Sequence, residues 1–394
     1  MEERVIYTPK EEIEKRIDGL KTLMDKESLE IAFFHYKVDY YYLSGTMQDA
    51  ILLVPLDDEP YLFVRREIER AKKESPFKNI IPLNSQKDMI DYLTPVKKVG
   101  IQIDVLPYRD VVRLKELLGN PDIYDASSLV KELRKRKSKF EIMLLERASE
   151  IQKRVYEYVP GVLREGMTEI ELGGILEAYA KTLGHEGILR MRSLNYEPYS
   201  WHILSGESGS IVGYADSPMA GFGLSPAFPV GASFKKIRRG EPVLVDFGVC
   251  YHGYQVDQTR IFAIGSIPKK FREAYEVTRE IQERIIELIP RGLKSKELFE
   301  EGRRIAEKYG YSEYYLGYGP YKVKFLGHGV GLELSELPFI AEGHDYPIEE
   351  GATLAIEPKM VFKGEGACGI ENTFVFEDGK VRALTDNDES IIII

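Results

Sequence analysis

The sequence predicts a mixed α/β (α+β) protein with a small N-terminal domain and a larger C-terminal domain. Its 394 residues are enough for two domains that each bury a core. In the first third of the chain, short apolar runs alternate with helix-like segments, which is typical of a small α/β unit. Further on, capping-box patterns begin long helical segments, and strand-like apolar runs carry single acidic residues.

The N-terminal domain is expected to span residues 1–130. Apolar residues at helical spacing predict an opening helix over 10–25, namely Ile13, Ile17, Leu20 and Met24. Apolar runs bounded by proline and acidic residues predict three strands, at 30–35, 50–55 and 60–64. Helical segments are expected at 66–75, 86–93 and 107–119.

The C-terminal domain is expected to span residues 131–394. Ser138 with Glu141, and Thr168 with Glu171, form capping-box patterns that begin two helices, the first reaching about residue 157. Two long helices are expected at 269–290 and 295–309, and a last strand or a docked tail at 391–394. Residues 205–233 are rich in glycine, serine and proline, and a loop this long is often functional.

Charge and cysteine content exclude several classes of protein. The net charge of −10 has the wrong sign for a nucleic-acid-binding protein. Two distant cysteines exclude a disulfide scaffold and suit a reducing compartment. Because no apolar run approaches the roughly 20 residues that span a bilayer, and no signal region is apparent, we expect a cytoplasmic protein without membrane contact.

Four acidic residues lie inside strand-like runs that form two matching hairpin patterns. Asp246 and Asp257 lie on either side of residues 251–254, and a hairpin with Tyr251 and His252 at its tip would place the two carboxylates opposite each other. Glu357 and Glu371 face each other in the same way if the chain folds back near residue 364. Taken one at a time, each of these acidic residues is more typical of a sheet edge or a turn than of a metal ligand.

A histidine lies between these two hairpins, in the run Gly-His-Gly-Val-Gly that contains His328. Glycines on both sides of a histidine allow other backbone to approach it closely. Burying four carboxylates costs too much desolvation free energy unless a cation compensates their charge. Two aspartates, two glutamates and one histidine therefore predict a site for a pair of divalent ions.

The chain resembles the pita-bread metallopeptidases, which include methionine aminopeptidase, aminopeptidase P and proline dipeptidase. Asp246, Asp257, His328, Glu357 and Glu371 follow the order of that family's metal ligands. The surrounding motifs at 253–260, 327–331, 356–358 and 369–373 are similar too. Residues 42–45 and 133–142 resemble the creatinase/prolidase N-terminal domain, which points to the two-domain proline-peptidase branch.

This resemblance implies a dinuclear hydrolase of the Xaa-Pro dipeptidase or aminopeptidase P type. It would bind two divalent ions (Mn, Co, Fe or Zn) and remove the N-terminal residue from short peptides by a metal-bridged hydroxide. Glu357 would be both a metal ligand and the catalytic proton shuttle. The resemblance also implies a homodimer.

Two departures from the family pattern affect the expected substrate. Ser335 stands where a second histidine normally follows the Gly-His-Gly run, and Val230 lies where another histidine normally precedes the first aspartate. Loss of one oxyanion donor typically costs about 2.7–4 kcal/mol. Two alternatives therefore stay open: a hydrolase or lyase that acts on a non-peptide small molecule at the same metal site, or a non-catalytic binding protein.

Four residues are candidates for substrate binding. His202 precedes the glycine-rich loop and could reach the metal site, with a structural role beside the only tryptophan as the alternative, and Ser335 stands where the missing imidazole would be. Tyr318 belongs to a tyrosine cluster before His328, and Arg190 could bind a substrate carboxylate. Ordinary packing and surface roles are the alternatives for these last two.

Overall fold

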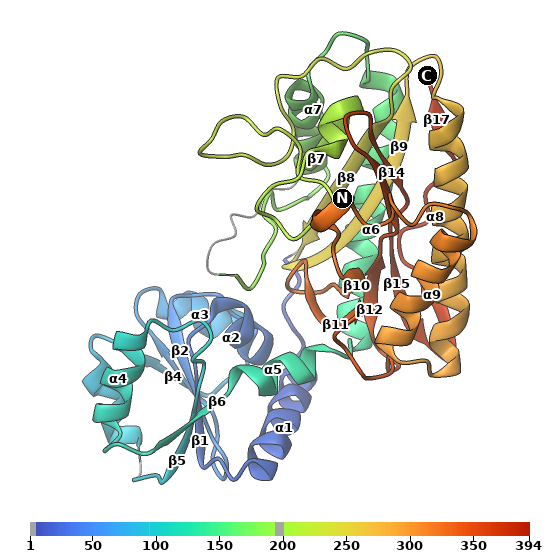
Figure 1. The fold of residues 1–394 in the computed structure, drawn as a ribbon. Helices are drawn as coiled ribbons and strands as arrows, with labels where there is room; N and C mark the ends of the chain where they lie inside the picture. The colour runs from blue at the N-terminus through green and yellow to red at the C-terminus, as the bar shows by residue number, and fades with distance from the viewer. Residues whose placement is uncertain (1–4, 94, 194–200) are drawn as a thin grey trace. The chain divides into compact units, whose positions relative to one another are not determined.

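The computed structural model describes residues 5–93, 95–193 and 201–394, and the chain divides into two compact units, Met1–Arg134 and Lys135–Ile394 (Figure 1). Each unit has a hydrophobic core of its own. The mixed α/β class predicted from the sequence is confirmed.

The N-terminal unit is built on a six-stranded mixed sheet in the order β4-β3-β2-β1-β5-β6. Its core contains Phe33, Phe63 and Ile101, all fully buried. The strands are β1 (Ile31–Phe34), β2 (Ala50–Pro55), β3 (Tyr61–Val64), β4 (Asn79–Pro82), β5 (Lys98–Ile101) and β6 (Asp122–Asp125). The helices are α1 (Lys10–Lys26), α2 (Lys37–Ser44), α3 (Ile68–Glu74), the 3-10 helix η1 (Gln86–Tyr92), α4 (Tyr108–Leu117) and α5 (Ser127–Arg134).

The C-terminal unit contains three sheets. A four-stranded sheet has the order β17-β9-β8-β7, a five-stranded sheet the order β11-β10-β12-β15-β16, and β13 pairs with β14. The first sheet comprises β7 (Trp201–Ser205), β8 (Val243–Tyr251), β9 (Tyr254–Ala263) and β17 (Ile392–Ile393). The others comprise β10 (Phe325–Gly329), β11 (Glu336–Ala341), β12 (Thr353–Ile356), β13 (Lys359–Phe362), β14 (Gly366–Gly369), β15 (Asn372–Glu377) and β16 (Lys380–Ala383).

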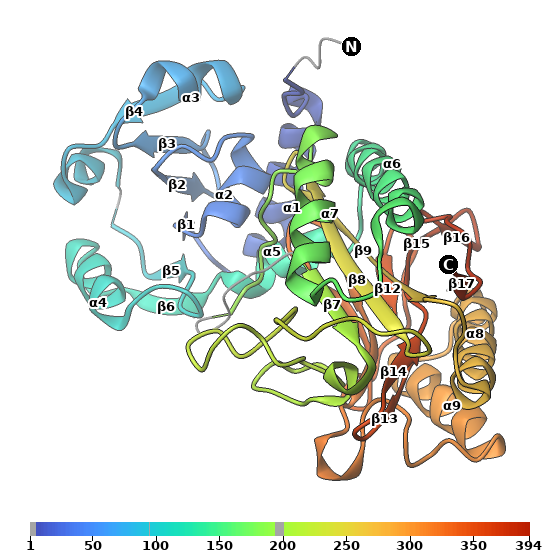
Figure 2. The same cartoon turned by 90° about the horizontal axis from the view of Figure 1, so that it is seen from above.

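Two pairs of helices flank these sheets on different sides (Figure 2). They are α6 (Lys139–Val162) with α7 (Glu169–Thr182), and α8 (Lys269–Leu288) with α9 (Ser295–Lys308). Short 3-10 turns complete the unit at η2 (Gly206–Ser210), η3 (Ile289–Arg291) and η4 (Gly319–Tyr321). Among the described residues, no helix is both long and apolar enough to span a membrane.

Local sequence signals explain where α6 and α7 begin. Both predicted capping boxes are present: Ser138 accepts from the backbone N–H of Glu141, whose side chain accepts from the N–H of Ser138, and Thr168 pairs with Glu171 in the same way. On α6, the Tyr156 hydroxyl donates to the carbonyl of Val245, 3.1 Å away, and so fixes the helix against β8. The same hydroxyl also contacts the carbonyl of Gln258 on β9, so Tyr156 packs α6 against both strands that carry the predicted aspartates.

Candidate metal centre

A cavity of about 380 Å³ in the C-terminal unit is lined by all five predicted metal ligands. The four-stranded and five-stranded sheets both contribute to it, together with the connections after β12 and before β15 that carry Glu357 and Glu371, so residues more than one hundred positions apart meet there. Its walls also include residues from the predicted glycine-rich loop and from the segment before β7. The lining residues are Leu189, Met191, Ser193, His202, Tyr214, Ala215, Asp216, Ser217, Asp246, Gly248, Asp257, Phe325, His328, Leu334, Ser335, Glu357 and Glu371.

The β8–β9 hairpin presents the two aspartates, but in a register that differs from the predicted one. Asp246 lies opposite Thr259, and Asp257 lies opposite Gly248, so the carboxylates are not directly opposed. The turn is at His252 and Gly253, both with positive φ, and not at Tyr251 and His252. A two-residue hairpin turn of type I′ has positive φ at both residues, and glycine at the second position provides it readily.

Glu357 and Glu371 lie at a break between two ladders. Ile356 pairs with Asn372 in the β12–β15 ladder, and Lys359 pairs with Gly369 in the β13–β14 ladder. Both pairings follow the register predicted for this hairpin. The break frees the two glutamates from strand pairing with each other and lets both side chains line the cavity.

His328 enters from β10, where it pairs with Ala355 of β12. A side chain at Gly327 would approach the Ala355 carbonyl oxygen to 2.5 Å, so glycine is needed for this close packing. The Nδ1 atom of His328 lies 3.2 Å from the Gly329 carbonyl, which can only accept, so Nδ1 carries the proton. Nε2 is then the ring nitrogen left for a metal ion; it lies 3.4 Å from Glu357 Oε1, and although burial opposes it, this contact raises the pKa of His328.

Burial dominates the electrostatics of the acidic residues. It raises the pKa of Asp257 well above its usual range, and the neighbouring Glu371 and Asp246 raise it further. Burial likewise raises the pKa of Glu371 to about 7. Burial would also raise the pKa of Glu357, but Lys359 and His328 hold it below its ordinary value. The cavity thus concentrates negative charge, with Glu357 its most readily ionised glutamate.

Lys359 is a member of this site that the sequence analysis missed. Its side chain is fully buried, and Nζ lies 3.0 Å from Glu371 Oε2 and 3.4 Å from Glu357 Oε2. The two carboxylates raise its pKa although burial opposes them. The available signal was a lysine inside the apolar run after Glu357, because a lysine in a buried strand needs a charged partner.

The candidate substrate-binding residues separate into two pairs. His202 and Ser335 line the cavity, and His202 Nδ1 lies 3.7 Å from Asp246 Oδ2 because β7 pairs His202 directly with Asp246. Tyr318 and Arg190 are not among the lining residues. The Tyr318 hydroxyl donates to the Ser210 carbonyl, and the Arg190 guanidinium lies 3.8 Å from Glu186.

The long loop at 205–233 contributes a further part of the wall, through residues 214–217. Glu169 fixes both ends of the loop, since its carboxylate accepts hydrogen bonds from Ser205 and Ser233 backbone N–H groups at 2.7 and 3.0 Å. Val230 is fully buried in this loop and does not line the cavity. The loop is therefore held in place at its ends and reaches the site in its middle.

Known protein families account for most of the chain. The model of metallopeptidase family M24 matches residues 143–378, and that of the creatinase/prolidase N-terminal domain matches residues 16–136. The chain belongs to metallopeptidase family M24. Among M24 relatives, the Xaa-Pro dipeptidases of Pyrococcus furiosus and Pyrococcus horikoshii are each 28% identical, covering 96% of this chain and 100% and 99% of their own.

Solved structures of M24 proteins share the fold. The prolidase from Pyrococcus horikoshii superposes with a TM-score of 0.81 at 27% identity, covering 96% of this chain and all of the other. The prolidase from Pyrococcus furiosus gives a TM-score of 0.76 at 28% identity, and the superposition covers 93% of this chain and 99% of the prolidase chain. These likenesses confirm the predicted resemblance and the pita-bread fold, and family membership makes this chain a metal-dependent peptidase.

The residues of the cavity fit a divalent ion. Asp257, His328 and Glu371 are buried and offer ligand atoms within 4.8 Å of one another. The Oε1 atom of Glu371 is buried and has no hydrogen-bond partner among the described residues, whereas buried polar atoms normally have one. Carboxylate oxygens with one imidazole nitrogen suit Mn, Fe, Co or Zn.

Proposed function

We propose that this M24 protein is an Xaa-Pro dipeptidase or aminopeptidase that removes the N-terminal residue from short peptides. The carrying observation is that Asp246, Asp257, His328, Glu357 and Glu371 all line one small cavity. Its volume is at the lower end of the range for ligand pockets, which suits a ligand the size of a short peptide. The names of the curated relatives support the same substrate class.

The five residues would hold the divalent ions, two according to the family resemblance, with Mn, Co, Fe and Zn as the candidates. Such ions supply a Lewis acid for the scissile carbonyl and lower the pKa of a bound water. Glu357 is suited to accept a proton on its carboxylate, because Lys359 and His328 keep its pKa below the ordinary value and so keep it ionised.

His202 and Ser335 would take over the substrate contacts for which the family uses two further histidines. Both line the cavity, and His202 lies beside Asp246. An imidazole and a hydroxyl can each donate to a developing oxyanion. A substrate role for Tyr318 or Arg190 has less support, because neither side chain lines the cavity.

The test is hydrolysis of a panel of Xaa-Pro dipeptides and longer Xaa-Pro peptides by the Mn²⁺- or Co²⁺-loaded protein. We expect turnover that Glu357→Gln reduces by at least about 100-fold, while metal-loaded Asp216→Asn, altered in the cavity wall, retains activity. A preference for dipeptides would identify a dipeptidase, and a preference for longer peptides an aminopeptidase. No turnover of any Xaa-Pro peptide by the metal-loaded protein would contradict the proposal.

We also propose that the protein works in the cytoplasm as a homodimer. Both cysteines, Cys250 and Cys368, are free and buried, which suits a reducing compartment. Light scattering coupled to gel filtration tests the dimer, and a mass near 45.1 kDa for the particle would contradict it.

A further inference from the structure

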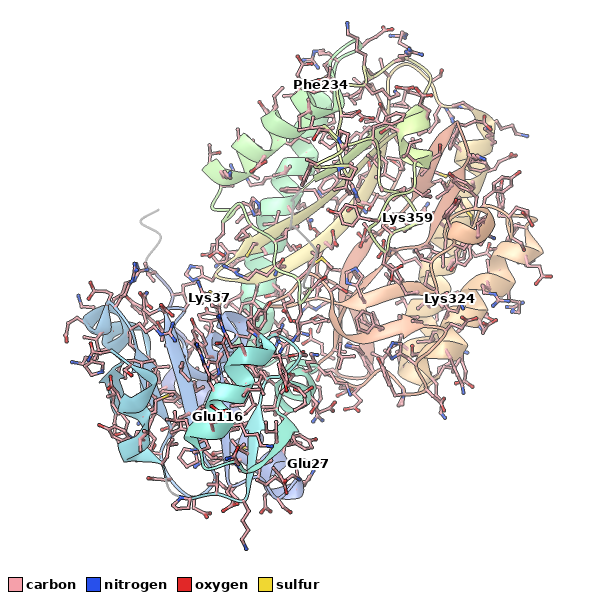
Figure 3. The ribbon with its side chains drawn as sticks, turned by 60° about the vertical axis from the view of Figure 1, so that its left-hand side comes forward. Glu27, Lys37, Glu116, Phe234, Lys324 and Lys359 are labelled. Atoms are coloured by element: carbon pink, nitrogen blue, oxygen red, sulfur yellow. The ribbon has the colours of Figure 1, made fainter. Side chains whose placement is uncertain are left out.

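Lys359 is unusual among the lysines of this chain. It is the first residue of β13, and its side chain has no exposed surface. Figure 3 labels it in the middle of the C-terminal unit, whereas Lys324, labelled in the same unit, has a side chain that is 79% exposed. A lysine is almost never fully buried unless it is paired.

The backbone around Lys359 is shaped to admit its side chain. Gly369 lies opposite it in the β13–β14 ladder. A Cβ atom at position 369 would lie only 2.6 Å from Lys359 Cδ. The absence of a side chain at Gly369 therefore leaves the space that the lysine stem occupies on its way to the carboxylates.

The ammonium group uses oxygen atoms that a second metal ion would need. Nζ contacts Oε2 of Glu371 and Oε2 of Glu357, at 3.0 and 3.4 Å. Thr259 also donates to Glu371 Oε2, at 2.7 Å, so this oxygen already has two donors. The Oε1 atom of Glu371 has none among the described residues.

This arrangement divides the site into two cation positions. Asp257, His328 and Glu371 gather ligand atoms for one ion, and Lys359 supplies a positive charge at the adjoining Oε2 atoms of Glu357 and Glu371. An ion that shared those oxygens would lie close to the ammonium, and like charges repel strongly where water is excluded. Asp246, the remaining carboxylate, already faces His202 at 3.7 Å.

We propose that the ammonium of Lys359 takes the place of one of the two cations, so that each chain holds one divalent ion tightly and a second only weakly. The inference rests on the proposed metal site and deepens it. It assigns to Lys359 a positioning role: the lysine fixes both glutamates and neutralises charge without contacting substrate.

The test is metal stoichiometry. The full-length protein and the Lys359→Met variant are stripped with chelator, loaded with Mn²⁺, passed through gel filtration and analysed for metal content. We expect about one Mn²⁺ per chain in the original protein and about two in Lys359→Met. The electron paramagnetic resonance spectrum should change from that of an isolated Mn²⁺ to that of an exchange-coupled pair.

Lys235→Met is the matched control, because it removes a lysine whose side chain is only 11% exposed and which pairs with Glu241 at 2.8 Å and not with a predicted ligand. It should leave the stoichiometry at one. Lys359→Gln keeps a hydrogen-bond donor but loses the charge. If Lys359→Met does not fold, this second variant should still bind about two Mn²⁺ ions per chain.

Two tightly bound Mn²⁺ per chain in the original protein would overturn the inference and leave the proposed function standing. An unchanged single ion in both Lys359 variants would also overturn it. No Mn²⁺ in any of the proteins would contradict the metal site itself, and with it both proposals.

Discussion

The acidic residues of the cavity owe their properties to burial and to one another. Asp257 and Glu371 have raised pKa values because water is excluded and further carboxylates lie nearby. Removing one such residue takes away a ligand atom and also part of the charge that attracts a cation. The effect on metal binding should therefore exceed the effect on folding.

We expect Asp257→Asn to lose bound metal. An amide in place of the carboxylate removes a charged ligand, and affinity for Mn²⁺ should fall by about tenfold or more. Titration calorimetry with Mn²⁺ measures this directly. Asp216→Asn, which alters an acidic residue of the same cavity that is not a predicted ligand, should bind Mn²⁺ normally. Equal affinities for the two variants would contradict the assignment of Asp257.

We expect Gly369→Ala to destabilise the protein by roughly 1–3 kcal/mol, the usual cost of overpacking. The new Cβ would lie 2.4 Å from the Pro358 carbonyl oxygen, which is backbone and cannot move aside easily. Gly161→Ala is the control, because nothing lies within 4 Å of a Cβ there and the site is helical. Its stability should stay the same or rise slightly. Urea denaturation of both variants measures the change in the free energy of unfolding. An undiminished free energy of unfolding for Gly369→Ala would count against the close packing described.

At the scale of elements, Glu301 joins α8 to α9. Its carboxylate lies 3.1 Å from Arg284 on α8 and 2.8 Å from Arg304 on α9. Hydrogen bonds from Arg304 and then Arg284 lower the pKa of Glu301 to about 2. Since the unfolded chain binds this proton near pH 4.5, the native state gains stability above that pH and loses it as the pH falls toward 2.

We therefore expect Glu301→Gln to lower the melting temperature at pH 6 and to lower it less at pH 3. The energy involved is about 1 kcal/mol, because the arginines are partly exposed to water. Thermal unfolding followed by circular dichroism at both pH values measures the difference. Glu300→Gln, which breaks an exposed pair with Arg303 on one helix, should have little effect at either pH. A Glu301 effect that is independent of pH would contradict the ionic origin.

Elements differ in how well the sequence predicts them. The starts of the helices with capping boxes and both ends of the long amphipathic helices were predicted nearly to the residue, because their signals are local. The end of α6 was predicted near residue 157, whereas the helix continues to Val162. Helix α2 was missed, since its three consecutive tyrosines favour strand as much as helix. The β8–β9 register was wrong by two residues because it depends on the turn conformation at His252 and Gly253.

The same distinction applies to the site. Four of the predicted ligands could be found because acidic residues are rare inside apolar strand-like runs, and His328 because glycines flank it; all five line the cavity. Lys359 could not be placed from the sequence, because its partners Glu357 and Glu371 are brought to it by the break between two ladders. The wall residues 214–217 depend on the path of a loop that has no periodic pattern.

At the scale of the whole molecule, two units with separate cores predict two unfolding transitions. Chelation by EDTA should lower only the transition of Lys135–Ile394, by roughly 5–10 °C if the ion is present at about 100 times its dissociation constant. Phe63→Ala, in the N-terminal core, should lower only the other transition. Differential scanning calorimetry resolves the two unfolding transitions. A single transition that is shifted both by EDTA and by Phe63→Ala would contradict two independently unfolding units.

The most direct test of the account is anomalous X-ray diffraction at the manganese edge, from crystals of the Mn²⁺-loaded protein. We predict one strong peak within bonding distance of Asp257, His328 and Glu371, with the ammonium of Lys359 still beside Glu357. A strong peak elsewhere, or none, would contradict the claim that these residues form the metal centre.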